Sequence, residues 1–301
     1  MTTEFPIGPH GGDAERIARS LGVSVDTFTD LSASVNPVAP DVRPLIADAI
    51  DAALRYPETE PATVALADVM GVDAERLILT NGGAEAIALV AALHPVGDVV
   101  EPAFSLYRRH LRQVESGGLV WRADPSSPMG VLAGADERAD VWDEAFWQLA
   151  TGTWTRTDDG AWRIGSLTKL WACPGVRLGY VVAPDAEQAT AVRERQPKWS
   201  VNGFAASIAP ALVELSDLPT WRDAVRARRA DLVAELRRRD LDVVDTAAPW
   251  VLVREPGLRA RLLAHRVVVR DCTSFGLIDT VRIAVPSDEQ RSALIGALDR
   301  L

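Results

Sequence analysis

Short apolar runs alternate with segments of helical periodicity through the middle of the chain. We expect strands near residues 77–79, 99–100, 119–121, 138–141, 162–164 and 178–182. Apolar residues that recur every three or four positions predict helices near residues 45–54, 62–69, 84–93, 104–115 and 186–196. Such alternation predicts a largely parallel sheet covered by helices, with ligands at the carboxyl ends of the strands.

The pattern changes after Asn202. Helices are expected near residues 204–215, 219–239, 256–264 and 287–300, and short strands near residues 242–245, 250–254, 267–270 and 280–285. This order of short strands and helices indicates a separate α+β domain, and we expect the first residues of the chain to belong to it. We therefore predict a large cofactor-binding domain over residues 40–215, unusually short between 121 and 143, and a small domain made of residues 1–39 and 216–301.

Composition narrows the class of protein without identifying it. The chain has 301 residues, 48% of them hydrophobic, which is enough to bury a core in each of two domains. A net charge of −10 argues against nucleic acid or an anionic membrane as a partner, so an anionic substrate must be met by local arginines. Two distant cysteines, Cys173 and Cys272, form no disulfide framework, and no long apolar span occurs, so we expect a cytoplasmic protein without a metal site.

Lys169 closes the run 166–169 (Ser-Leu-Thr-Lys) and precedes Arg177, which lies in the run 174–180 (Pro-Gly-Val-Arg-Leu-Gly-Tyr). A lysine amine can bond covalently to the aldehyde of pyridoxal phosphate, while a nearby hydroxyl and a guanidinium hold its phosphate. A Ser-Thr-Lys run is by itself usually a solvated turn. The neighbouring segments decide between the two interpretations.

Two further segments favour the cofactor. The run 81–85 (Asn-Gly-Gly-Ala-Glu) follows an apolar strand-like run and precedes a helical pattern. Glycines at such a junction let backbone amides approach a phosphate, and the helix start adds the positive end of its dipole. Asp143 ends a short strand-like run, where an aspartate can pair with the cofactor ring nitrogen and keep it protonated. Glycine loop, aspartate, lysine and arginine in this order predict a pyridoxal phosphate site.

With these segments, the chain resembles the fold type I pyridoxal phosphate enzymes, in the branch of the histidinol-phosphate aminotransferases and the threonine-phosphate decarboxylases of cobalamin synthesis. The likeness runs almost end to end. It leans toward the decarboxylases in the His-Gly-Gly run at 10–12, the Ser-Ala-Ser-Val-Asn-Pro run at 32–37 and the Trp-Ser-Val-Asn run at 199–202. Other matching segments are Arg-Tyr-Pro-Glu at 55–58, Pro-Ala-Phe-Ser-Leu-Tyr-Arg-Arg at 102–109, Val-Arg-Asp at 269–271 and Val-Arg-Ile at 281–283.

The resemblance implies an α/β fold with a large domain, built on a mixed and mostly parallel sheet, and a small α+β domain. It implies that Lys169 is the catalytic residue and the covalent attachment point. It also implies a homodimer, because Tyr56 matches a tyrosine that reaches the cofactor phosphate of the neighbouring subunit. The implied cofactor-binding residues are Tyr56, Gly82, Gly83, Ala84, Phe104, Ser127, Asp143, Ser166, Lys169 and Arg177, and the implied substrate-binding residues are His10, Asn36, Arg270 and Arg282.

The chain departs from the family pattern in three places. Ser127, in the run 124–130 (Asp-Pro-Ser-Ser-Pro-Met-Gly), stands where the family has an asparagine that contacts the cofactor ring oxygen. Phe146 stands where aminotransferases use a tyrosine at the same oxygen, as in the decarboxylase branch. Between Gly130 and Ala139 there is little room for the family's crossover helix, so one sheet face would be exposed unless a partner covers it.

Three functions remain open on the sequence. The first is a decarboxylase of a phosphorylated amino acid such as threonine phosphate. The second is an aminotransferase of the histidinol-phosphate type, which would use the same residues but break a different bond. The third is a cofactor-binding homologue with degenerate catalysis, suggested by Ser127 and the short middle segment.

Overall fold

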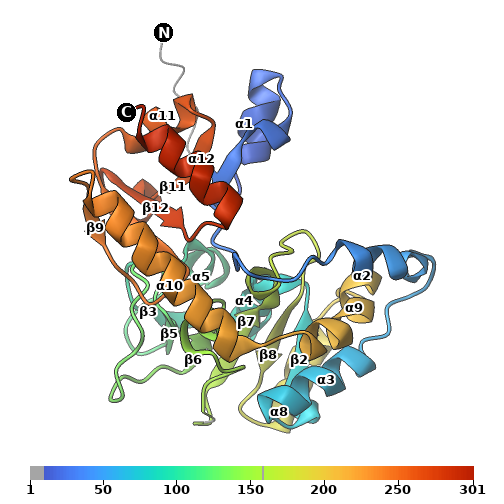
Figure 1. Ribbon diagram of the computed structural model, residues 1–301. Coiled ribbons are helices and arrows are strands. Elements are labelled where there is room, and N and C mark those ends of the chain that lie inside the picture. Colours follow the sequence, from blue (N-terminus) through green and yellow to red (C-terminus); the bar gives the residue numbers. More distant parts are fainter. Residues whose placement is uncertain (1–9, 158) are drawn as a thin grey trace.

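The computed structural model describes residues 10–157 and 159–301 and contains two sheets (Figure 1). The larger sheet has seven strands in the order β2-β8-β7-β6-β5-β3-β4. Strand β8 pairs antiparallel with β2 and β7, and the other neighbours pair in parallel. The strands are β2 (Leu77–Thr80), β3 (Val96–Val99), β4 (Gln113–Val114), β5 (Leu119–Ala123), β6 (Val141–Asp143), β7 (Trp162–Ser166) and β8 (Gly179–Val182). The predicted α/β class with a mixed, mostly parallel sheet is confirmed.

Helices cover one face of this sheet and part of the other. Helices α4 and α8 and the apolar side chains of α5 pack on one face, while α3, α7 and α9 and the first half of α10 close the apolar core on the other. Helix α10 then continues to the smaller sheet, so it links the two halves of the molecule (Figure 1). The helices are α2 (Arg43–Asp48), α3 (Glu60–Met70), α4 (Gly82–Leu93), α5 (Ser105–His110), α6 (Trp147–Thr151), α7 (Leu167–Leu170), α8 (Ala186–Arg195), α9 (Gly203–Glu214) and α10 (Leu218–Arg237).

The smaller sheet joins the two ends of the chain. Its order is β1-β11-β12-β10-β9, and β1 pairs in parallel with β11, so residues 29–31 lie beside residues 267–269. Its elements are α1 (Ala14–Leu21), β1 (Thr29–Leu31), β9 (Asp242–Val244), β10 (Trp250–Arg254), α11 (Leu258–Ala264), β11 (Val267–Asp271), β12 (Thr280–Ala284) and α12 (Asp288–Leu298). The domain bounds at residues 39 and 215 stay a prediction.

Local sequence signals explain where several helices begin and end. Asn202 accepts the amide of Ala205 at 2.9 Å and so caps the start of α9. Ser287 and Gln290 form a reciprocal capping box at the start of α12. Gly71 ends α3 in the left-handed conformation, where a residue without a Cβ costs least.

One predicted helix is wrong in detail, and the expected shortness of the middle segment is confirmed. The helix expected over residues 104–115 ends at His110, because Gln113 and Val114 pair with β3 instead. Between β5 and β6, residues 124–140 form neither helix nor strand, so this parallel connection lacks a crossover helix. The short middle segment therefore bridges two adjacent strands as an irregular loop. In the part of the chain that the structure describes, no helix combines the length and apolar character that a membrane crossing needs.

Candidate active site

Lys169 lies on α7, directly after the carboxyl end of β7. Its amine donates to Thr168 Oγ1 at 3.4 Å, and the backbone amide of Asn36 donates to its carbonyl at 2.9 Å. Burial lowers the pKa of the Lys169 amine to about 8, and the positive charges of Arg177 and Arg282 act in the same direction. A larger share of this amine is therefore neutral and nucleophilic near pH 8 than for an exposed lysine.

The glycine loop meets Ser166 and Arg177 at the start of α4. Gly82 has a positive φ of 73°, and a Cβ there would collide with the guanidinium of Arg177. A Cβ on Gly83 would come within 3.2 Å of Ser166 Cβ. Ala84 follows in the first turn of α4. The fold therefore brings together a helix N-terminus, a hydroxyl and a guanidinium, which are the donors that a phosphate requires.

Asp143 is the last residue of β6, and both of its carboxylate oxygens accept hydrogen bonds. Tyr107 donates its hydroxyl to Oδ2 at 2.7 Å, and the amide of Ala145 donates to Oδ1 at 2.9 Å. Burial raises the pKa of Asp143, while these two hydrogen bonds and the charge of Lys169 oppose that rise. The ring of Phe104 packs edge-on against Tyr107, with ring centres 6.1 Å apart. Sequence reasoning missed Tyr107, although its place one helical turn after Phe104 was a signal.

Arg270 and Arg282 face each other across β11 and β12, where they are direct partners in the antiparallel register. Both are buried, and burial lowers the pKa of Arg282 to about 10. Arg270 donates to Ser274 Oγ at 2.7 Å. The ring of His10 lies 5.6 Å from that of Phe104, and the pKa of His10 is lowered by burial and then by the charge of Arg270. His10 thus lies beside a ring of the cofactor side, and the charge of Arg282 reaches Lys169, whose pKa it lowers.

Residues 119–298 match the sequence model of the family described as aminotransferase class I and II. The chain belongs to this family. It is therefore a pyridoxal phosphate enzyme of the decarboxylase or aminotransferase kind.

Individual relatives agree with this assignment. The chain is 30% identical to a threonine-phosphate decarboxylase of Salmonella typhimurium, over 96% of this chain and 95% of that protein. It is 22% identical to histidinol-phosphate aminotransferase 1 of Dechloromonas aromatica, over 96% and 94%. The first alignment runs over 349 positions, more than the 301 residues here, so the decarboxylase has residues that this chain lacks.

Solved structures share the fold. L-threonine-O-3-phosphate decarboxylase from Porphyromonas gingivalis superposes with a TM-score of 0.76 at 21% identity, covering 90% of this chain and 98% of that one. Histidinol-phosphate aminotransferase from Sinorhizobium meliloti, in complex with pyridoxal-5'-phosphate, gives a TM-score of 0.77 at 18% identity, covering 99% and 95%.

The residues at the site fit the cofactor of this family. A lysine amine with a lowered pKa suits the aldehyde of pyridoxal phosphate, and a buried carboxylate held from two sides suits its ring nitrogen. Two glycines at which a Cβ would crowd Arg177 and Ser166 suit its phosphate. Ser127 is 8% exposed in the loop after β5, and Phe146 packs edge-on against Trp250 with ring centres 4.6 Å apart. Among the described residues, no group of acids, histidines and cysteines could hold a metal ion.

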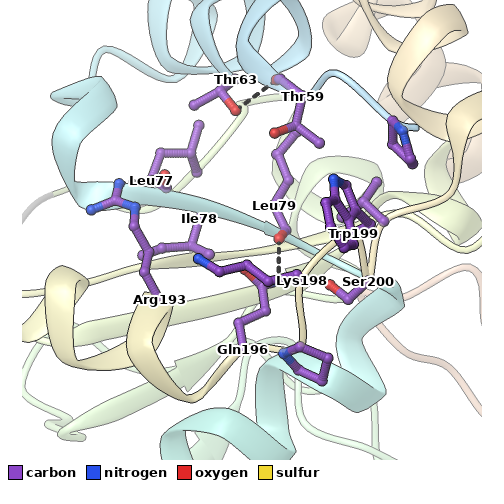
Figure 2. A pocket seen from close by; sticks show the side chains of 13 residues that line it. Thr59, Thr63, Leu77, Ile78, Leu79, Arg193, Gln196, Lys198, Trp199 and Ser200 are labelled. Carbon is purple, nitrogen blue, oxygen red and sulfur yellow. Dashed lines mark hydrogen bonds between the residues drawn. The ribbon is translucent and has the colours of Figure 1, made fainter. Parts of the chain in front are cut away.

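Tyr56 is the predicted site residue whose side chain is exposed in the single chain. Its side chain is 77% exposed, and its ring stacks on Trp199 with centres 4.5 Å apart. Trp199 also lines a cavity of about 280 Å³, and none of the predicted site residues lines it (Figure 2). In its wall, Arg193 and Gln196 donate to carbonyls of β2 at 3.2 and 2.8 Å, and so cap the free edge of the large sheet.

Proposed function

We propose that the protein decarboxylates a phosphorylated amino acid of the threonine-phosphate type. The observation that carries the proposal is the pair Arg270 and Arg282, two buried guanidinium groups placed opposite each other on neighbouring strands. Like charges at such positions repel, so the pair favours a ligand with two anionic groups. A phosphoamino acid offers a carboxylate and a phosphate in one molecule, and the 30% identical relative is a threonine-phosphate decarboxylase.

Each residue then has a role in the reaction. Pyridoxal phosphate, when bound, supplies a delocalised ring that accepts the electron pair of the broken bond. Gly82, Gly83, Ser166 and Arg177 would hold its phosphate, Asp143 would keep its ring nitrogen protonated, and Phe104 would stack on its ring. Arg282 would orient the carboxylate that leaves as carbon dioxide. The freed Lys169 amine would then deliver a proton to the substrate α-carbon.

We further propose a homodimer in which Tyr56 serves the site of the neighbouring subunit. The exposed stack of Tyr56 on Trp199 supports this, and the exposed side chains of Ile50 and Leu54 lie close to Tyr56 in the chain. Several exposed apolar side chains in one segment are typical of an interface. The two buried free thiols, Cys173 and Cys272, also suit a reducing compartment, so we propose a cytoplasmic location.

Subunit mixing tests the shared site. Variants Y56A and K169A should each be nearly inactive, whereas hybrids of the two would contain one intact site if Tyr56 crosses the interface. Activity that reappears on refolding the mixture, together with a dimeric mass, is the expected result. A mixture as inactive as its components would show that Tyr56 acts within its own chain.

The reaction itself is tested by incubating the cofactor-loaded protein with O-phosphothreonine. We expect carbon dioxide and an amino alcohol phosphate without a keto acid, and no product from K169A. A keto acid together with pyridoxamine phosphate would instead establish the aminotransferase. Bound cofactor without either product would establish a catalytically degenerate homologue.

A further inference from the structure

The irregular loop between β5 and β6 is held by the segment that leads into β10 of the smaller sheet. The indole N–H of Trp250 donates to the carbonyl of Pro128 at 2.8 Å, and the amide of Ala247 donates to the carbonyl of Gly130 at 2.7 Å. Gly130 has a positive φ of 66°, and a Cβ there would lie 2.6 Å from Thr246 Cβ. Residues 246–250 therefore hold the loop through two hydrogen bonds and one close packing contact.

Trp250 has a second set of contacts through its ring. The guanidinium carbon of Arg282 lies 4.8 Å from the ring centre, within the range of a cation–π interaction, and Phe146 packs edge-on from another side. The side chain of Trp250 is completely buried, and Thr246 Oγ1 donates to its carbonyl at 2.5 Å. One rigid indole thus contacts the arginine of the substrate side and the loop that carries Ser127.

We propose that Trp250 is a positioning residue that couples Arg282 to the Ser127 loop, so that a ligand on Arg282 also orders residues 126–131 beside the cofactor. The inference rests on the proposed roles of Arg282 and Ser127. Its physical basis is that the indole joins both groups with no intervening flexible side chain, so a shift of the guanidinium is transmitted to the Pro128 carbonyl.

Two substitutions separate the contacts of Trp250. Trp250→Phe keeps an aromatic face for Arg282 and Phe146 but removes the N–H donor to Pro128. Trp142→Phe is the matched control: Trp142 is equally buried, Arg156 lies 3.9 Å above its ring, and its indole N–H has no hydrogen-bond partner among the described residues. Both variants lose the same atoms, and only one loses the contact in question.

Hydrogen exchange of the loop amides is the readout. Ser126, Gly130 and Val131 donate their amides within the loop, so their exchange reports its order. In Trp250→Phe these amides should exchange about fivefold faster, as expected for the loss of one hydrogen bond, while Trp142→Phe matches wild type. O-phosphothreonine should slow the exchange in wild type and in Trp142→Phe, and have little effect on it in Trp250→Phe.

Kinetics give an independent test on the loaded enzyme. Trp250→Phe should lower kcat with little change in KM, whereas Trp250→Leu, which also removes the aromatic face, should raise KM as well. Equal exchange and equal kcat in Trp250→Phe and Trp142→Phe would overturn the coupling. If wild type turns over no phosphoamino acid but the exchange difference without ligand persists, the proposed function fails and the support of the loop by Trp250 stands.

Discussion

On one face of the seven-stranded sheet, Trp121, Val141 and Trp162 stand side by side in register and pack in the apolar core under α4. On the opposite face, the next residues of the same three strands are Arg122, Trp142 and Arg163. The first row is covered by helices. In the second row, Arg122 and Trp142 lie on the two strands that the loop 124–140 joins, and this loop has no helix.

The second row is closed by charge pairs and hydrogen bonds in place of a helix. Arg156 lies over the ring of Trp142 and forms an ion pair with Asp124, which is 1% exposed. On the same face, Glu144 accepts hydrogen bonds from Tyr180 at 2.6 Å and from the amide of Arg156 at 2.8 Å. The comparison teaches that a sheet face can lose part of its helical cover when charged groups on it pair with one another, because pairing offsets much of the cost of burying them.

Removing the central aromatic side chain should have the largest effect. Trp142→Ala should lower the free energy of unfolding by about 3–5 kcal/mol, because it opens a large cavity. With Arg156→Met already present, the loss should be smaller by roughly 1 kcal/mol, since the cation–π contact is gone. Urea denaturation measures both values. Trp121→Ala, on the helix-covered face, should cost the same in both backgrounds, and a background effect there would contradict the distinction between the faces.

Breaking the ion pair should come next. Arg156→Met should cost about 3 kcal/mol, because it leaves Asp124 buried without its cationic partner. The double variant Asp124→Asn with Arg156→Met should recover most of that loss, since neither charge of this ion pair remains. Thermal and urea unfolding of the three proteins form the test. A double variant as unstable as Arg156→Met would mean that packing, and not charge, carries the contribution.

A pH profile can sharpen the comparison further. Burial raises the pKa of Glu144 from 4.5 to about 7, although its hydrogen bonds oppose the rise. The folded state therefore holds this proton more tightly, so the contribution of Glu144 to stability is greatest below pH 4.5 and is lost as pH rises through 7. Between pH 4.5 and 7 the wild type should lose free energy of unfolding on the order of 2 kcal/mol through Glu144, and Glu144→Gln should not show this loss. The exposed Glu194→Gln should keep the wild-type profile, and an unchanged profile in Glu144→Gln would refute the assignment.

The outermost pair of the polar face should matter least. Arg122 forms an ion pair with Glu137, whose side chain is 44% exposed. Glu137→Ala should change the free energy of unfolding by at most about 1 kcal/mol, and by less at high salt. Denaturation at two ionic strengths checks this, and a larger loss would show that the loop 124–140 depends on this contact.

Local patterns were sufficient to place the main strands and helices along the chain. The strand, glycine turn and helix around Gly82 lie within one short segment, so neighbouring residues alone predict them. The helix expected to continue past His110 was wrong because β3 supplies pairing for Gln113 and Val114 from another part of the chain. Long-range pairing overrides a local helical period in such cases.

Contacts between distant residues could not be predicted in the same way. Trp250 and Pro128 lie 122 positions apart in the chain, and no spacing rule connects them. Tyr107 and Asp143 lie 36 positions apart and meet because α5 packs against the face on which Asp143 ends β6. The assignments of individual site residues, including Ser127 and Tyr56, remain predictions that the proposed experiments test.

The sequence by itself determined the family, the cofactor and the order in which glycine loop, aspartate, lysine and arginine occur, because those signals are short and chemically distinctive. Only the tertiary structure decided what covers the sheet where the crossover helix is absent, and which side chains support Asp143 and Arg282. The physical reason is that burial, pKa and hydrogen-bond partners depend on groups that folding brings together, and these lie far apart in the chain.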